Sequence, residues 1–263
     1  HSSKDPYWQA SVRREVLAHP EAKEEIQDEC AACHMPMARY RAKASGRKGK
    51  IFAHLPVGPG GGHADRLAEA GVSCTMCHQI QEEGLGEERS FTGGFVVDTA
   101  QPLGGREIFG PFDVDPGRTR LMQSAAEYRP AKAEHVQRSE LCASCHTLYT
   151  HTRGAGGEVV GELPEQVPYL EWRHSAYRDT RSCQSCHMPT LNGPMHLTGV
   201  LGQQRPNFSR HVFRGGNFFM LNMLNRYRAA LGVKATTAGL TESSRRTTEH
   251  LKTSAATVSF DAV

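Results

Sequence analysis

The stretch CAACH at residues 30–34, Cys30-Ala31-Ala32-Cys33-His34, decides how the rest of the chain is read. Two thiols three positions apart are followed at once by an imidazole, which is the CxxCH pattern. The pattern recurs as CTMCH at 74–78, CASCH at 142–146 and CQSCH at 183–187. All eight cysteines of the 263-residue chain belong to it. The chain is therefore organised around four equivalent sites, numbered 1 to 4 in chain order.

Three chemistries could use such sites. A disulfide framework does not require a histidine after each cysteine pair. A zinc site needs two CxxC pairs that converge on one tetrahedral ion, and it leaves the adjacent histidine unexplained. In covalent c-type haem attachment, both thiols of CxxCH bond to one haem and the histidine ligates its iron. Since positions i, i+3 and i+4 share one face of a helical turn, one short segment presents all three groups to the same porphyrin.

We therefore expect four c-type haems as the cofactors. The expected thioether attachments are Cys30, Cys33, Cys74, Cys77, Cys142, Cys145, Cys183 and Cys186, and the expected proximal iron ligands are His34, His78, His146 and His187.

Ten further histidines could supply the second axial ligand of each iron, and bis-histidine ligation needs four of them. The favoured set is His54, His63, His135 and His211, with His19 and His196 in reserve and His151 and His174 behind these. His1 and His250, near the chain ends, are expected to be neither. Met35 and Met188 directly follow a proximal histidine, which puts them on the wrong face of their own haem. They are expected to pack on porphyrin edges.

Composition limits the other options. Hydrophobic residues make up 38% of the chain, beside 26 glycines and 14 prolines, so haems are expected to supply part of the apolar interior. A formal charge of +3 with scattered basic residues gives no argument for nucleic acid. No apolar run reaches the roughly 18 residues of a membrane helix. The chain does not begin with methionine, and we expect a processed, exported protein of the periplasm or the extracellular space.

The sequence predicts a mainly α, haem-packed fold with long irregular loops and little β structure. Helices are expected over 7–33, with a break near His19-Pro20, and over 64–78, 131–146 and 165–187. Residues 38–62 and 191–214 are expected to be loop and extended chain, and 90–120 a small β-hairpin or an irregular lid. A tetrahaem domain over 1–214 would then be followed by a helical segment over 215–263. That segment packs on the domain or on a partner, with one helix near 217–231 and another capped by Thr241. The last residues, SAATVSFDAV, alternate like the start of a strand, so the chain is a candidate fragment of a longer protein.

Several phrases resemble a known family. CHMPMAR, GVSCTMCHQI, LCASCHTLYT, PEQVPYLEW, SCQSCHMP and HVFRGGN together resemble bacterial multihaem c-type cytochromes related to the tetrahaem cytochrome that accepts electrons from hydroxylamine oxidoreductase. The resemblance runs from about residue 25 to 232. It implies closely stacked, mostly bis-histidine haems in a helical, loop-rich fold. Larger members continue into a β-domain and some tetrahaem members form extracellular filaments, so both remain open for this chain.

The expected function is electron transfer between redox partner proteins, because a bis-histidine iron has no open position for chemistry. An oxidoreductase that acts on a small nitrogen compound is the alternative, and it needs one haem without a distal histidine. A conducting filament subunit or another oligomer is a further option that overlaps with the first.

Overall fold

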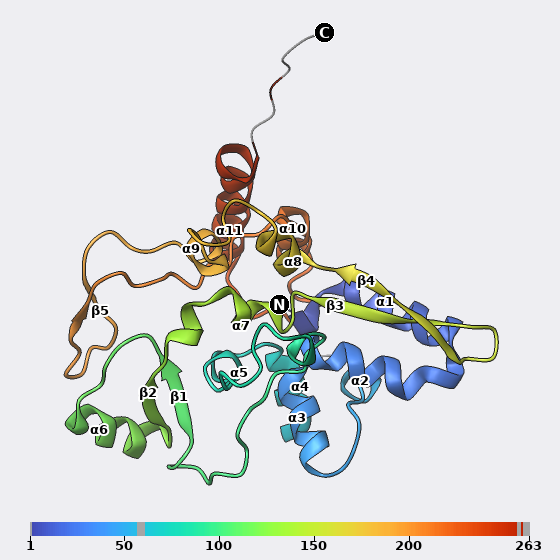
Figure 1. Ribbon diagram of the computed structural model, residues 1–263, viewed down its shortest axis with the longest axis horizontal. Coiled ribbons are helices and arrows are strands. Elements are labelled where there is room, and N and C mark those ends of the chain that lie inside the picture. Colours follow the sequence, from blue (N-terminus) through green and yellow to red (C-terminus); the bar gives the residue numbers. More distant parts are fainter. Residues whose placement is uncertain (1, 57–60, 257–258, 260–263) are drawn as a thin grey trace.

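The computed structural model describes residues 2–56, 61–256 and 259, so His1 lies outside the described residues. These residues form a mainly helical chain with three two-stranded sheets and long loops, which agrees with the expected mainly α structure with little β (Figure 1). None of the helices in these stretches has both the length and the apolarity that a bilayer crossing requires. The strand expected near the C-terminus falls largely outside the described residues.

The N-terminal helices follow the sequence closely. A 3-10 turn, η1 (Ser2–Lys4), leads into α1 (Pro6–Ala18), where the Asp5 side chain accepts the N–H groups of Tyr7 and Trp8. The helix ends at His19, and after η2 (Pro20–Ala22) the chain continues as α2 (Lys23–His34). The predicted break near His19-Pro20 is therefore confirmed.

The loop predicted over 38–62 is wrong in its first part. The chain forms α3 (Pro36–Ala44), with Pro36 at the first helical position, where its missing N–H is not needed. Only then does it become irregular, with a short turn η3 (Phe52–His54). The single helix predicted over 64–78 is divided into α4 (His63–Ala70) and α5 (Cys74–Cys77). Gly71 separates the two at a φ of 57°.

The hairpin predicted over 90–120 is wrong, although residues 91–106 are irregular, as the alternative expected. After η4 (Glu88–Ser90), strand β1 (Glu107–Gly110) pairs in parallel with β2 (Arg129–Lys132). The connection between them is α6 (Pro116–Ala126), which begins because Asp115 caps Gly117 and Arg118. The helix predicted over 131–146 is accordingly shorter, since strand β2 and η5 (Glu134–Gln137) precede α7 (Ser139–Ala143).

Beyond site 3 the chain forms a hairpin of β3 (Leu148–Arg153) and β4 (Val159–Gln166). The helix predicted over 165–187 is two helices, α8 (Pro168–Arg173) and α9 (Cys183–His187). The following stretch is extended as expected, apart from the two-residue strands β5 (Met195–His196) and β6 (Gln204–Arg205).

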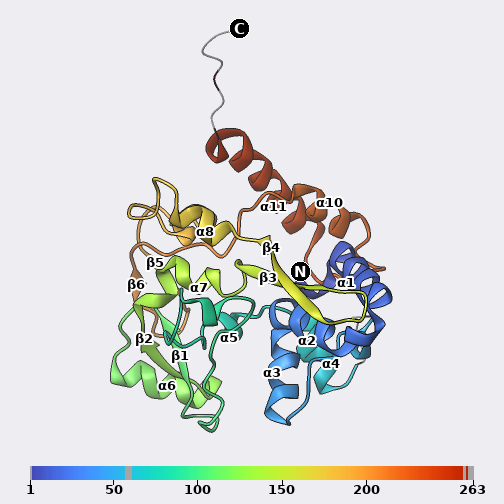
Figure 2. The same ribbon diagram turned by 45° about the vertical axis from the view of Figure 1, so that its right-hand side comes forward.

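Two helices end the described chain. Asn217 caps α10 (Phe218–Arg226), and Thr236, not the predicted Thr241, caps α11 (Thr237–His250) through Gly239 N–H. A π-helical turn, η6 (Leu251–Ala255), follows α11. The helices α10 and α11 pack against each other, with Asn225 Nδ2 donating to Thr241 Oγ1 over 3.1 Å (Figure 2).

The apolar clusters are small. One joins α1, α2, α3 and α4 through buried side chains that include Val12, Met35 and Ile51. The other joins Met76, Ile80 and Phe95 near site 2. Met35 is 1% exposed, so its thioether packs in the protein interior.

Candidate functional site

The attachment helices of sites 2 and 4 are built alike. Ser73 and Ser182 each precede the first cysteine of their site, and each side chain accepts a backbone N–H of the next turn. The cap starts the helix at the cysteine, so both thiols and the histidine fall within about one turn. Site 1 lies instead at the end of α2, and site 3 begins within the last residues of α7.

The proximal imidazoles are oriented by backbone carbonyls. The Nδ1 of His34 lies 3.0 Å from Ser2 O, that of His78 lies 2.6 Å from Phe109 O, and that of His187 bonds to the carbonyl of Arg214. A carbonyl only accepts, so Nδ1 carries the proton and Nε2 is left with its lone pair. Metal-ligating histidines are usually held in this way. The Trp8 ring also stacks on His34, with 4.1 Å between ring centres.

The four sites gather around site 3. The Cys33 thiol lies within hydrogen-bonding reach of the Cys145 thiol, and Cys142 contacts Cys183 in the same way. Cys77 lies close enough to Cys142 and to Cys145 for their charges to interact. Site 3 is therefore the neighbour of all three other sites, although it is third in the chain.

Gly93 allows sites 1 and 3 to approach each other. Its N–H donates to Ser144 O over 2.7 Å, and its φ is 73°. A Cβ at this position would lie 2.5 Å from the Cβ of Ala32. Only glycine combines this left-handed backbone with such close contact to the neighbouring chain.

No disulfide joins the thiols, and their environments differ. All eight cysteines are free. Burial raises the pKa of the Cys30 thiol to about 12 and that of Cys77 to about 11. Zinc prefers thiolates, which these two environments disfavour. Across the described stretches, no three or more His, Cys, Asp and Glu side chains are grouped so that they could hold a metal ion.

Two pairs of histidines lie at a separation suited to one iron. The ring centres of His78 and His211 are 6.0 Å apart, and those of His187 and His250 are 6.1 Å apart. A metal–nitrogen bond of about 2.0 Å plus roughly 1.1 Å from nitrogen to ring centre predicts about 6.2 Å between two trans imidazoles. These residues therefore fit bis-histidine ligation at sites 2 and 4.

From the sequence, His250 is expected not to be an iron ligand because it lies near the chain end. A helical pattern could have identified it, because α11 buries Leu240, Ser244 and Thr247. His250 follows Thr247 by three positions and continues this face toward the protein. The composition of α11 is polar, which hides the pattern when the sequence is read alone.

Two other candidates lie in environments suited to a ligand, although no described imidazole is paired with either. His54 Nδ1 lies 2.8 Å from Asp65 Oδ1, which leaves Nε2 available. His135 is 2% exposed, and its Nε2 donates to Ile80 O over 2.8 Å. Its Nδ1 is buried and has no partner among the described residues. Any ligation by His135 would therefore use Nδ1.

The remaining candidates lie at the surface. His63 begins α4 with its side chain exposed, and His174 ends α8 in the same state. His196 Nδ1 bonds to Gly202 O in the extended stretch. His151 sits between Glu29 and Glu162, and His19 lies 3.6 Å from Glu21. The structure brings none of these five close to a second imidazole in the part of the chain that it describes.

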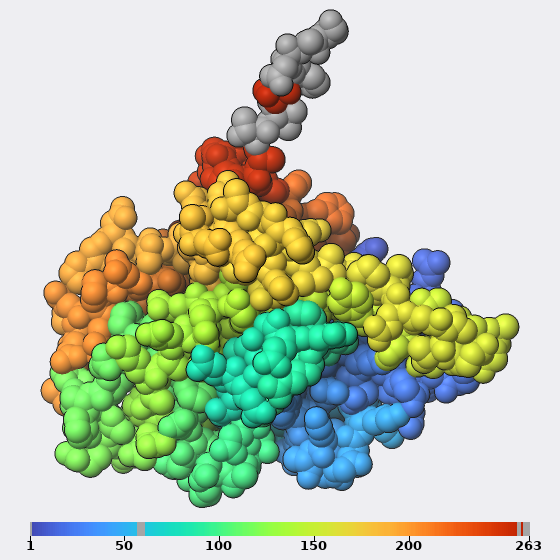
Figure 3. Space-filling view, in the orientation of Figure 1, coloured from blue at the N-terminus to red at the C-terminus, as the bar shows by residue number. Residues whose placement is uncertain are grey.

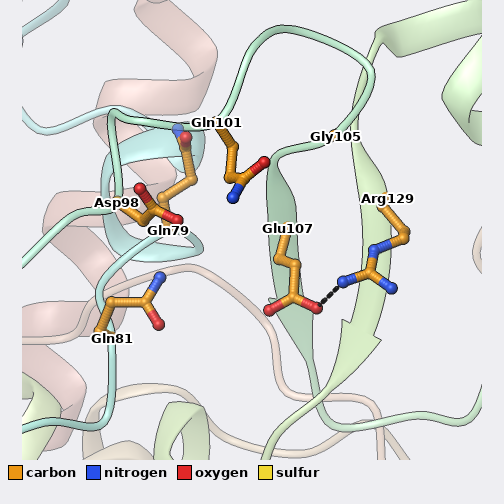
Figure 4. Close-up of a pocket in the computed structure, with 7 residues that line it drawn as sticks. All are labelled: Gln79, Gln81, Asp98, Gln101, Gly105, Glu107 and Arg129. Carbon is orange, nitrogen blue, oxygen red and sulfur yellow. Dashed lines mark hydrogen bonds and ion pairs between the residues drawn. The ribbon is translucent and has the colours of Figure 1, made fainter.

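A polar cavity of about 440 Å³ lies beside site 2 (Figure 4). Its lining residues are Gln79, Gln81, Asp98, Gln101, Gly105, Glu107 and Arg129. Glu107 and Arg129 form an ion pair across the β1–β2 sheet. The lining includes no cysteine or histidine, so the cavity lies outside the proposed haem-binding residues.

An ion-pair cluster fixes the N-terminal segment that supports His34. Lys4 Nζ lies 2.9 Å from Glu69 Oε1, both side chains are more than 90% buried, and Lys4 also donates to Gly232 O. Lys234, which is exposed, lies 3.1 Å from the same carboxylate. Hydrogen bonds from Lys4 and Lys234 lower the pKa of Glu69. The cluster therefore ties η1, α4 and the chain after α10 together.

Replacing Glu69 with glutamine is expected to lower the free energy of unfolding at pH 7 by about 2 kcal/mol, because Lys4 is left buried without a counter-ion. A lowered folded-state pKa means that the pair stabilises above the ordinary glutamate pKa and loses this effect as the pH falls through the folded value. The difference from wild type should therefore shrink below about pH 4.3. Urea denaturation followed by circular dichroism measures it. Lys234→Gln is the matched control and should cost less than about 0.5 kcal/mol. Equal losses in both variants would contradict this account.

Comparison of the chain with protein-family models, with curated proteins and with solved structures gave no match. The case for its function therefore rests on the four motifs and on the geometry described above.

Proposed function

We propose that the protein is an exported electron carrier, periplasmic or extracellular, with four covalently attached c-type haems. The observation that carries the proposal is the pairing of His78 with His211 and of His187 with His250, each at the separation that a shared iron requires. Each pair includes the histidine of a CxxCH motif, where haem attachment is expected. When bound, each haem supplies an iron that gains and loses one electron.

Different residues of this chain would attach the haems, orient the proximal imidazoles and supply the distal ligands. The eight cysteines would anchor the porphyrins, and the carbonyls of Ser2, Phe109 and Arg214 hold three proximal rings with Nε2 free. His211 and His250 would close the second axial position at sites 2 and 4. The contacts among Cys33, Cys145 and the other thiols keep the four attachment points adjacent, and short distances favour fast electron transfer.

Electron transfer is preferred over catalysis for two reasons. An iron with two histidine ligands has no open position for a substrate. The polar cavity beside site 2 is lined by amides and carboxylates but by none of the proposed ligands. An open-site haem that acts on a small nitrogen compound remains the alternative for sites 1 and 3. The resemblance to multihaem cytochromes related to the acceptor of hydroxylamine oxidoreductase supports the carrier proposal.

Haem content and ferric spin state test the proposal. The chain, produced in a host with c-type haem maturation, is expected to carry four haems by mass spectrometry and by pyridine haemochrome absorbance. Paramagnetic resonance should detect at least two low-spin ferric haems, and carbon monoxide should bind to neither. A Cys183→Ser/Cys186→Ser variant should lose one haem. A chain that binds zinc instead, or high-spin iron at every site, would refute the proposal.

A further inference from the structure

Charge is distributed unevenly along the chain. Residues 171–256, called the basic lobe here, contain twelve lysines and arginines but only four aspartates and glutamates. Residues 1–170 contain nineteen lysines and arginines and twenty-three aspartates and glutamates. The basic lobe comprises the end of α8, then α9, the extended stretch with β5 and β6, and the helices α10 and α11. It is gold to red in Figure 3, where it covers the top and the upper left side of the molecule. The protein is therefore polarised, with an excess of eight positive charges at one end.

Most of this charge is not neutralised within the chain. Among the residues that the structure describes, only Arg178, Lys234, Arg245 and Arg246 of the basic lobe form ion pairs. The other eight cations have no carboxylate partner there. One haem at site 4 would add two propionates, which could neutralise only a small share of the excess.

Exposed arginines of the lobe lie over tyrosine rings. Arg173 lies over Tyr169, Arg181 over Tyr177 and Arg226 over Tyr227, at 5.7, 5.6 and 5.5 Å from the ring centres. All three arginines are exposed. Arginine and aromatic residues are the types enriched at protein interfaces, and stacking restricts the guanidinium before any partner arrives.

Site 4 opens onto this lobe. His187 is exposed, and Phe213, which precedes the Arg214 whose carbonyl binds His187, is 64% exposed. The Arg214 side chain carries a buried Nε without a partner among the described residues. It is also close enough to His250 to act on the charge of that ring. The basic lobe therefore contains an attachment site whose proximal histidine is exposed.

We propose that the basic lobe is the docking face for an acidic redox protein, and that electrons cross to this partner at site 4. This inference rests on the proposed function. A haem held by Cys183, Cys186, His187 and His250 would supply an iron that gives up one electron, and the redox group of the partner would gain it, with no bond made or broken. Long-range attraction between opposite charges speeds encounter and orients the partner toward site 4.

Salt dependence of the wild-type protein provides the first test. The reduced holoprotein is mixed in a stopped-flow instrument with oxidised plastocyanin, an acidic copper protein, or with oxidised cytochrome c, a basic haem protein. The rate with plastocyanin should fall at least tenfold between about 10 mM and about 500 mM salt, because screening removes the attraction. The rate with cytochrome c should show no such fall. Salt-independent oxidation by plastocyanin overturns the docking proposal.

A matched pair of charge-reversal variants locates the face. In Arg173→Glu/Arg178→Glu/Arg226→Glu, the low-salt rate with plastocyanin should fall at least tenfold. The control, Arg14→Glu/Arg47→Glu/Arg120→Glu, changes the net charge equally at exposed positions outside the lobe. Its rate should fall less than threefold. Equal losses in the two variants overturn the proposal. The salt dependence of the wild type tests the same idea if the first variant does not fold.

Two further measurements separate the other outcomes. Oxidation by benzoquinone, which is uncharged, reports electron transfer without charged docking. If benzoquinone oxidises the protein normally but the plastocyanin rate does not depend on salt, the docking proposal is overturned and the carrier proposal stands. If the haems show no redox change at all, both proposals are overturned. If the first variant abolishes binding to phosphatidylserine vesicles while its plastocyanin rate is unchanged, the lobe is assigned to a membrane surface. If it abolishes self-association in light scattering instead, again with an unchanged plastocyanin rate, the lobe is assigned to contact with a second copy. Either result overturns the proposal.

Discussion

Replacing His211 with glycine is expected to convert one haem of the four from low spin to high spin. His211 is the only imidazole near His78 in the described chain, at 6.0 Å between ring centres. Its removal would leave the site 2 iron with one protein ligand and an open sixth position. The high-spin fraction in paramagnetic resonance should rise by about one haem per chain, and that haem should bind carbon monoxide.

The glycine variant also allows a rescue experiment. Imidazole added to His211→Gly should return the iron to low spin, because the deleted side chain leaves room for it. His196→Gly is the matched control, since His196 lies in the same extended stretch and bonds only to Gly202 O. An unchanged spectrum for His211→Gly would remove this residue from the ligand set. His250→Gly should behave like His211→Gly, with the change at site 4, because His250 lies 6.1 Å from His187.

His211 and His250 show which iron ligands can be predicted from the sequence and which cannot. The CxxCH spacing is local, so it identifies attachment cysteines and proximal histidines without any knowledge of the fold. A distal ligand comes from a remote segment, and its identity depends on tertiary packing. His211 is predicted because it follows the last motif, between an extended stretch and the helix expected near residue 217, where the chain can fold back onto a haem. His250 is presented by α11, whose buried face consists of Leu240, Ser244 and Thr247 and is too polar to stand out in the sequence.

The errors in secondary structure have a related cause. The helices predicted over 64–78 and 165–187 were drawn as continuous because each leads to a CxxCH motif. In both cases a serine, Ser73 or Ser182, starts a new short helix at the cysteine itself. The β1–β2 pairing joins residues about 22 positions apart, such as Glu107 and Arg129, across a helix. A pairing of this kind depends on long-range contacts that local propensity does not contain.

Removing site 3 is expected to have the largest effect on stability. The Cys145 thiol touches that of Cys33, and Cys142 touches Cys183, so site 3 adjoins two other attachment points directly. A Cys142→Ala/Cys145→Ala variant should lose its own haem, together with the packing that this haem gives to sites 1 and 4. We expect the free energy of unfolding to fall by more than about 4 kcal/mol, the range reached when a structural cofactor is lost. Much of the variant should fail to accumulate as holoprotein.

Site 2 supplies the matched control. Cys74 is exposed, and Cys77 is close to Cys145 only at the range of a charge interaction, without the direct thiol contact that Cys33 makes. Cys74→Ala/Cys77→Ala should also lose one haem, but the other three should remain attached and the yield should stay within about threefold of wild type. Mass spectrometry counts the haems on each chain, and guanidinium denaturation followed at the Soret band gives stability. The prediction rests on the central position of site 3. It is therefore decided by which of the two variants has the lower free energy of unfolding. If the site 2 variant is the less stable, the thiol contacts do not describe how the haems support one another, and electrons would have to pass between sites by a different route.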